Sequence, residues 1–418
     1  MIQPVRSENP QLGYFLRGAR SVVSTRTLGA VRRFIMGILF AVYDRTVSGM
    51  QEALGDAPTP SAMRQSLRYP GLTPKLQRLV DWKTSQNIRK ALRRTRKRPH
   101  PIVLAIDSTF KGTLSTLAWD LFHPGRGERI GNHIFVFGIL VFPDGRILPL
   151  RPRQKKRGRG TATQVDLAAE LVASVADELA GQRVVVTADA FFFAKKFLRA
   201  IQAAGFHYVI ACKGNTVLRD RSNLDSLLQR TRLKGSSVTL PSPRGERQRN
   251  FSVALRHLDL RCGGTQAVVF SRPHKKRGAR VKFLVSDLLD ATAAEIARLY
   301  ALRWQVEVFF REAKMYLGLD QYRLSGKWAP ENFALLVTLA YQFLHWSGDL
   351  AGPPMSTLAH IKQLARQIDA DNVVTIERAA VTRHRRKKIR ESFHVHRPSS
   401  AQNSRNARKP NRKLRRAS

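Results

Sequence analysis

Cysteine, acidic residues and long apolar runs are all scarce in this 418-residue sequence, and each scarcity excludes a class of protein. The two cysteines, Cys212 and Cys262, form no Cys-x-x-Cys pair, which argues against a disulfide scaffold and a structural zinc finger. The longest uncharged run has 17 residues, from Asn332 to Gly348, whereas a bilayer needs roughly 20 apolar residues. We therefore expect a buried helix in this run, no signal peptide and a reducing, cytoplasmic compartment.

Positive charge dominates the composition. The chain has 73 Lys and Arg residues against 30 Asp and Glu, a formal net charge of +43. Hydrophobic residues make up 43% of the chain, which is enough for a folded core and excludes a wholly disordered basic protein. A folded protein with this charge implies a polyanionic partner. We expect DNA and no membrane, although an anionic membrane surface is the second possibility.

Composition changes mark the ends of the folded core. Residues 1–100 show mainly helical patterning and end with a basic cluster, which is followed by the helix-breaking segment Pro99-His100-Pro101. We therefore predict a helical DNA-binding part over residues 1–100. The last 36 residues contain 14 Lys or Arg and one acid, Glu391. We therefore predict a helical segment and a disordered basic tail over residues 351–418.

Short apolar runs of strand length begin after Pro101. Ile102–Ile106 is closed by Asp107, and Val184–Ala188 is closed by Asp189. Two further runs, 134–141 and 147–150, flank a Pro-Asp-Gly turn and predict a hairpin. The order strand, strand, strand, helix, strand, helix, strand fits the opening of a ribonuclease-H-like sheet. The prediction is thus an α/β fold with a mixed sheet, whose core covers 101–218 and 279–350 with a β-strand insertion at 219–278.

A polar stripe follows one predicted helix. Thr292 and Glu295 have the spacing of a capping box, and we expect a helix from there through at least Lys314. At about 100° per residue, one stripe about 60° wide holds four polar residues: Tyr300, Arg303, Glu307 and Lys314. Apolar residues cover much of the remaining surface, so the stripe should line an internal site. Glu312 points elsewhere, near 120°. The alternative is an ordinary i,i+4 ion pair between Arg303 and Glu307.

Three carboxylates suggest a metal site. Asp107, Asp189 and Glu307 can converge on paired divalent cations, because Mg²⁺ prefers carboxylate oxygens. Two such ions about 4 Å apart can clamp the attacking and leaving oxygens of a phosphoryl transfer. Arg303 and Lys314 would then hold nearby phosphates. An aspartate after an apolar strand is more often a turn residue, so the combination rather than either aspartate carries this prediction.

These residues resemble a known family. The spacing Tyr300-x2-Arg303-x3-Glu307-x6-Lys314 resembles the Tyr-Arg-Glu-Lys signature of bacterial insertion-sequence DDE transposases. The segments AIDST, with Asp107, and TADAFF, with Asp189, resemble that family's first two acidic motifs, so the resemblance covers roughly residues 100–345. It implies a ribonuclease-H-like fold and two Mg²⁺ ions, with Mn²⁺ as a possible substitute. It also implies nicking at the ends of a mobile element, transfer of the freed 3′-hydroxyl into target DNA, a homodimer across two ends and a bacterial, nucleoid-associated location.

Other residues have competing interpretations. The resemblance implies that Trp304 could stack on a displaced base, although a core aromatic is the more common role for such a residue. Tyr300 can hydrogen-bond a phosphate or be an ordinary core tyrosine. The basic loop with Lys155, Lys156 and Arg157 would suit a DNA backbone, but such loops are usually just solvated.

Two rival functions are compatible with the same residues. A purely architectural DNA-binding protein would need the basic surface but none of the carboxylates. A metal-dependent nuclease on the same fold would cut DNA without strand transfer. Residue chemistry does not separate a nuclease from a transposase; only the resemblance favours transposition.

Overall fold

The computed structural model describes most of the chain between residues 9 and 367. The described ranges are 9–41, 44–54, 58–95, 100–112, 119–123, 128–158, 160–231, 235–241, 248–274, 280–324, 326–347 and 356–367. The predicted basic tail lies outside these ranges. None of the helices in the described ranges is long and apolar enough to cross a membrane.

The element order alternates helices and strands after a helical N-terminal region. The helices are α1 (Pro10–Phe15), the 3-10 turn η1 (Ala19–Ser21), α2 (Thr25–Phe40), α3 (Val47–Leu54), α4 (Pro60–Arg68), α5 (Leu72–Thr95), α6 (Gln164–Ala173), α7 (Lys195–Ala203), α8 (Leu224–Arg230), α9 (Ala293–Ala301), α10 (Trp304–Leu317) and α11 (Ala329–Trp346). The strands are β1 (Ile102–Gly112), β2 (Trp119–His123), β3 (Glu128–Val141), β4 (Ile147–Pro149), β5 (Arg153–Gln154), β6 (Val184–Ala188), β7 (His207–Cys212), β8 (Ser236–Pro241), β9 (Gln248–Leu260), β10 (Gly264–Pro273) and β11 (Lys282–Ser286). Residues 357–367 are also helical.

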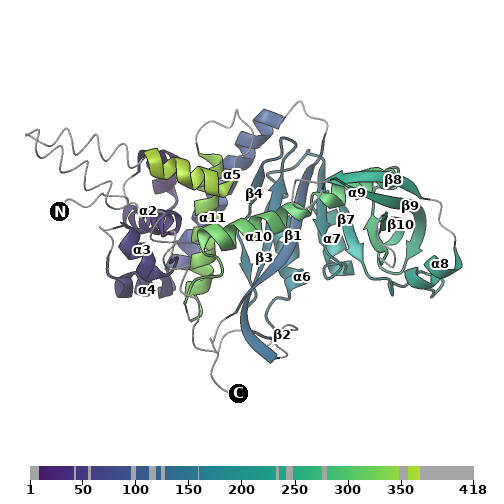
Figure 1. Cartoon of the computed structure of the whole chain (residues 1–418), viewed down its shortest axis with the longest axis horizontal. Coiled ribbons are helices and arrows are strands. Elements are labelled where there is room, and N and C mark those ends of the chain that lie inside the picture. Colours follow the sequence, from purple (N-terminus) through teal and green to yellow (C-terminus); the bar gives the residue numbers. More distant parts are fainter. Residues whose placement is uncertain are drawn as a thin grey trace, which may run out of the picture.

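One mixed sheet organises the molecule. Its strand order is β2-β3-β1-β6-β7-β11-β10-β9-β8, with β4 and β5 paired to β3. β1 and β3 are antiparallel, whereas β1, β6 and β7 run parallel to one another. This combination of an antiparallel hairpin and parallel crossovers through α6 and α7 is the predicted ribonuclease-H-like arrangement, so the fold class is confirmed. Figure 1 shows the N-terminal helices at one end of the sheet and β8–β10 at the other.

Two local predictions have different outcomes. The hairpin at the Pro-Asp-Gly turn is confirmed: Val141 pairs with Ile147, and Gly145 takes the positive φ of 84° that favours glycine. The expectation that the first strand ends at Asp107 is wrong, because β1 continues to Gly112. The extension is stabilised by pairing with β3 along the whole segment, from Val103 opposite Val141 to Gly112 opposite Asn132.

The strands between residues 219 and 278 extend the core sheet. β11 pairs antiparallel with β7 on one side and with β10 on the other. β9 and β8 then complete the far edge, and α8 precedes them in the chain. The sheet is therefore continuous from the core strands to the edge at β8.

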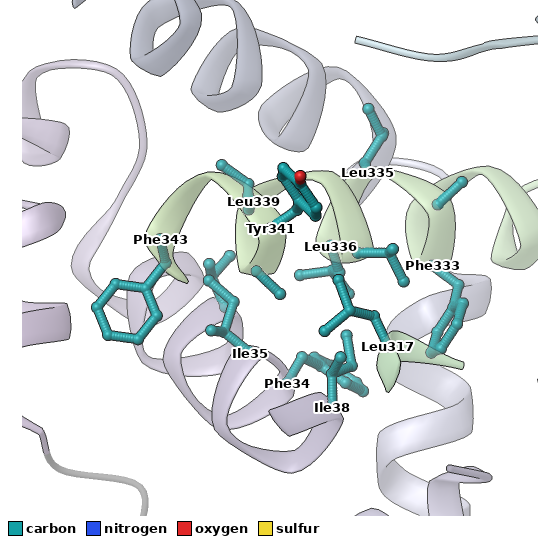
Figure 2. Close-up of a cluster of buried hydrophobic side chains, with 14 of the residues drawn as sticks. Phe34, Ile35, Ile38, Leu317, Phe333, Leu335, Leu336, Leu339, Tyr341 and Phe343 are labelled. Carbon is teal, nitrogen blue, oxygen red and sulfur yellow. The ribbon is translucent and has the colours of Figure 1, made fainter. Parts of the chain in front are cut away.

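The N-terminal helices share a hydrophobic core with the sheet and with α10 and α11. Figure 2 shows Phe34, Ile35 and Ile38 of α2 packed beneath α11, beside Leu336 and Leu317. The same cluster reaches Ala105 of β1 and Phe137 of β3, which lie under α10. The predicted buried helix is confirmed as α11, in which all residues but one are buried. The second face of the sheet is covered by α6 and α7.

The long helix predicted from Thr292 is two helices. The capping box forms as expected, since the Thr292 hydroxyl accepts from Glu295 N–H and the Glu295 carboxylate accepts from Thr292 N–H. α9 nevertheless ends at Ala301 and α10 begins at Trp304. Bonds of the i→i+3 type, such as Arg303 N–H to the Tyr300 carbonyl, replace the α-helical pattern at this point. The polar stripe is therefore interrupted between Tyr300 and Glu307.

Candidate active site

Strand register places the two aspartates next to each other. β1 and β6 are parallel, and their last paired residues are Ile106 and Ala188. Asp107 is the next residue within β1 and Asp189 comes directly after the end of β6, so the two lie at the same level of the sheet. Side chains alternate along a strand, so Asp107 lies on the face of Ala105, which is the face under α10. Adjacent strands are about 4.8 Å apart, which brings the two aspartates into direct electrostatic contact.

Arg303 connects Asp107 to Glu307. Its Nη1 lies 2.7 Å from Asp107 Oδ2, and its Nη2 lies 2.5 Å from Glu307 Oε1. The Arg303 side chain is only 11% exposed, compared with 17% for Asp107 and 33% for Glu307. The i,i+4 pair is therefore present, but the same guanidinium also reaches across to β1. A surface ion pair would not make this second contact.

The electrostatics indicate that all three acids share one site. Burial raises the pKa of Asp107, and the nearby Asp189 and Glu307 carboxylates raise it further. The Arg303 guanidinium and a hydrogen bond from Ser108 N–H act in the opposite direction. Burial alone would lower the pKa of Arg303, but its anionic neighbours raise it above its ordinary value. The positive charge of Arg303 thus offsets the repulsion among the acids.

Lys282 is a site residue that sequence reasoning missed. It begins β11, and its ammonium lies 5.1 Å from the centre of the Tyr300 ring. Arg303 lies 5.8 Å from the same ring, so two cations flank Tyr300. Burial and Arg303 lower the pKa of Lys282, while Glu307 and Asp189 raise it. No local pattern marks this lysine, because only the pairing of β11 beside β7 brings it to the acids.

Lys314 and Trp304 lie apart from the ion pairs of the acids. Burial lowers the pKa of Lys314, and the acid that faces it is Asp320 rather than Asp107 or Glu307. Trp304 begins α10, and its indole N–H is buried without a hydrogen-bond partner among the described residues. Glu312 points away from the site, as predicted, and accepts a hydrogen bond from the Thr357 hydroxyl at 2.8 Å.

The basic loop after β5 is partly engaged by the protein itself. Lys156 forms a 2.5 Å ion pair with Glu331, near the start of α11. Lys155 continues the pairing with β3 through its backbone N–H, which donates to the Ile134 carbonyl. Arg157 is exposed. A DNA contact by these three residues stays a prediction, and for Lys156 it requires exchange of its carboxylate partner.

The acids fit a hard divalent cation by their chemistry. Within the described ranges, no group of three His, Cys, Asp or Glu side chains is arranged to hold a metal ion. Arg303 bonds two of the three carboxylates, so its guanidinium neutralises part of their negative charge in this structure. Carboxylate oxygens are the ligands that Mg²⁺ prefers, and the three acids offer no competing nitrogen or sulfur donor.

Comparison with known proteins relates the central part of the chain to transposases. The family model described as the transposase DDE domain matches residues 151–343, a range that includes Asp189 and Glu307. A relative from Geobacillus stearothermophilus, described as a probable transposase for insertion sequence element IS5377, is 30% identical over 168 residues. The matched segment spans 40% of this chain and 40% of that relative. A cryo-EM structure of a piggyBac transposase synaptic complex with hairpin DNA aligns with 92% of this chain and 81% of its own, at 13% identity and a TM-score of 0.43.

The predicted resemblance to insertion-sequence DDE transposases is thereby confirmed for the central part of the chain. The four-residue signature from Tyr300 to Lys314 stays a prediction, as do the roles of the individual acids.

Proposed function

We propose that this protein is a DNA transposase that cuts the ends of an insertion sequence and joins them to target DNA. The observation that carries the proposal is that Arg303 bonds Asp107 and Glu307, with Asp189 beside Asp107, in a chain whose residues 151–343 match the transposase DDE family. Two of these acids come from adjacent parallel strands and the third from a helix that crosses the same face of the sheet. This arrangement suits phosphoryl transfer.

Divalent metal use is implied by the matched family, and Asp107, Asp189 and Glu307 would hold the metal. When bound, two Mg²⁺ ions would stabilise the charge that develops on the attacking and leaving oxygens. The chain itself supplies the three carboxylates, of which Asp107 is largely buried, and the cations around them. Burial of Asp107 under α10 keeps water from screening these charges.

Arg303, Lys282 and Tyr300 form the phosphate-facing part of the proposed site. The Arg303 guanidinium has a planar fork that matches two phosphate oxygens as well as it matches the carboxylates that it now contacts. Lys282, at the start of β11, adds a second positive charge. The Tyr300 ring contacts the cationic groups of both Lys282 and Arg303. These residues would orient the scissile phosphate against the acids.

DNA is the proposed partner, in keeping with the charge of +43. Joining two ends of one element requires two active sites, so we propose that the protein acts as a homodimer on DNA. A basic, DNA-acting enzyme of this kind would work in the bacterial cytoplasm on the nucleoid.

The test is cleavage of a DNA fragment that carries the element's own end, with Mg²⁺, by wild type and by Glu307→Gln. We expect the variant to lose cutting while it keeps DNA binding, because binding depends on the basic surface. Glu52→Gln is the matched control: the same change at an exposed glutamate on α3. Equal cutting by wild type and Glu307→Gln would remove Glu307 from the site.

A second readout separates a transposase from the rival functions. Incubation with a supercoiled target plasmid yields joined products only if strand transfer occurs. Cutting without joined products would identify a nuclease. Binding without cutting, in wild type and variants alike, would identify an architectural DNA-binding protein.

A further inference from the structure

The N-terminal region has a hollow that the transposase site does not use. It lies where α1 and η1 meet the first half of α2, and its lining includes Gly13, Tyr14, Arg17, Arg20 and Arg32. This part of the chain precedes the matched family range, which begins at residue 151. In Figure 1, α2 lies at the end of the molecule away from β8–β10.

Three arginines around the hollow have no carboxylate partner among the described residues. Within the described ranges, the guanidinium groups of Arg17, Arg20 and Arg32 make no hydrogen bond or ion pair, and the Nε of Arg32 is buried without a partner. No acidic residue occurs between residues 9 and 41. An anion bound among these guanidinium groups would lower their mutual repulsion.

An aromatic ring adjoins this charge. Tyr14 is 63% exposed, and the Arg17 guanidinium lies 5.0 Å from the centre of its ring. Glycine at position 13 keeps the hollow open: a Cβ there would meet only the Arg32 guanidinium, at 4.0 Å. Guanidinium forks bind phosphate oxygens in pairs, and exposed aromatic rings stack on bases or sugars. Both features together fit a nucleotide within a polynucleotide better than they fit an isolated inorganic anion.

We propose that this hollow binds a backbone phosphate of DNA, with Tyr14 against the adjacent sugar or base and Arg17, Arg20 and Arg32 around the phosphate. The inference rests on the proposed function, since it assigns a contact for the same DNA at a distance from the acids. The hollow would be a docking point for DNA in the N-terminal helices that contributes affinity and orientation rather than sequence specificity.

The experiment compares binding of a labelled DNA duplex by four full-length proteins over a series of salt concentrations. The double variant Arg17→Gln/Arg20→Gln removes two cations from the hollow. Arg26→Gln is the matched control, an exposed arginine on α2 that does not line it. Gly13→Leu fills the hollow without any change in charge. Thermal unfolding of each protein verifies that the fold is kept.

We expect the double variant to bind about tenfold to a hundredfold more weakly than wild type, since it cannot form the charge-assisted hydrogen bonds to phosphate. The slope of log affinity against log salt should fall by about 0.9 for each phosphate that the protein no longer neutralises. Gly13→Leu should weaken binding as well, and Arg26→Gln should match wild type.

Equal affinity and slope for the double variant and Arg26→Gln would overturn the proposal. If wild type binds and cuts DNA in that case, the proposed phosphate site alone is wrong and the transposase function stands. If wild type fails to bind duplex DNA, both fall. Weaker binding of the double variant to an acidic peptide but not to DNA would assign the hollow to a protein partner and would also overturn the proposal.

Discussion

Arg303 is the residue that links two acids of the candidate site. It contacts Asp107 on β1 and Glu307 on α10, and its side chain is nearly enclosed. Removing one member of a partly buried ion-pair network leaves the others without a counter-charge, which costs more than the loss of a surface pair. The residue therefore has a measurable structural role besides any contact with phosphate.

Arg303→Gln should lower the stability of the metal-free protein by about 1–3 kcal/mol, because Asp107 and Glu307 lose their cation. Mg²⁺ should then raise the melting temperature of the variant more than that of wild type. Thermal unfolding with and without Mg²⁺ measures both effects. An equal Mg²⁺ effect on both proteins would show that Arg303 does not offset the charge of the acids.

Lys282→Gln tests the residue that the sequence did not reveal. We expect DNA cutting about tenfold slower, equivalent to about 1.4 kcal/mol, with DNA affinity unchanged within about twofold. Lys282→Arg should keep most of the activity, since the charge remains near the acids. Lys213→Gln, an exposed lysine after β7, serves as the control. Weaker affinity at constant turnover would make Lys282 a binding residue only.

At the scale of elements, a polar network joins α10, α11 and the helical residues 357–367. The His345 ring stacks on Tyr341 with centroids 4.2 Å apart, and its Nε2 lies 2.9 Å from the Thr357 hydroxyl. Thr357 in turn donates to Glu312 on α10. The network fixes the second half of the helix that carries Glu307.

Burial, with the neighbouring His360 and Arg146, lowers the pKa of His345 to about 3. The unfolded chain takes up a proton at its ordinary pKa of about 6.5, whereas the folded protein resists it. Stability is thus fully present above pH of about 6.5 and is lost as the pH falls toward 3, at up to about 1.4 kcal/mol per pH unit.

His345→Gln keeps hydrogen-bonding capacity but cannot titrate, so its stability should vary less over that window. Denaturant unfolding at several pH values measures this difference. His257→Gln, at an exposed position of β9, is the control. The same pH dependence in wild type and His345→Gln would exclude His345 as the cause.

At the scale of the molecule, the N-terminal helices and the sheet share one hydrophobic core. α11 is buried between α2, α4 and α5 on one side and the sheet on the other, within a single apolar cluster. The chain changes from helices to strands near residue 100, where the boundary is predicted, and the hydrophobic core continues across that point.

A chain without residues 1–95 should fail to fold as a soluble protein, because it exposes α11. In the whole chain, Leu339→Ala should cost about 2–5 kcal/mol and lower a single unfolding transition that involves both parts. Circular dichroism of the truncated chain and calorimetry of Leu339→Ala measure these outcomes. A truncated chain with native-like unfolding would contradict the shared core.

The sequence by itself determined the features that depend on neighbouring residues. Apolar runs ending near Asp107 and Asp189, the Pro-Asp-Gly hairpin and the Thr292 capping box follow from local propensity, and their order along the chain was enough to predict the ribonuclease-H-like fold. Only the tertiary structure decided the remainder. The extension of β1 depends on pairing with β3, and the place of Lys282 depends on β11 lying beside β7. The two bonds of Arg303 and the core shared by α2 and α11 join residues distant in sequence, which no local pattern records.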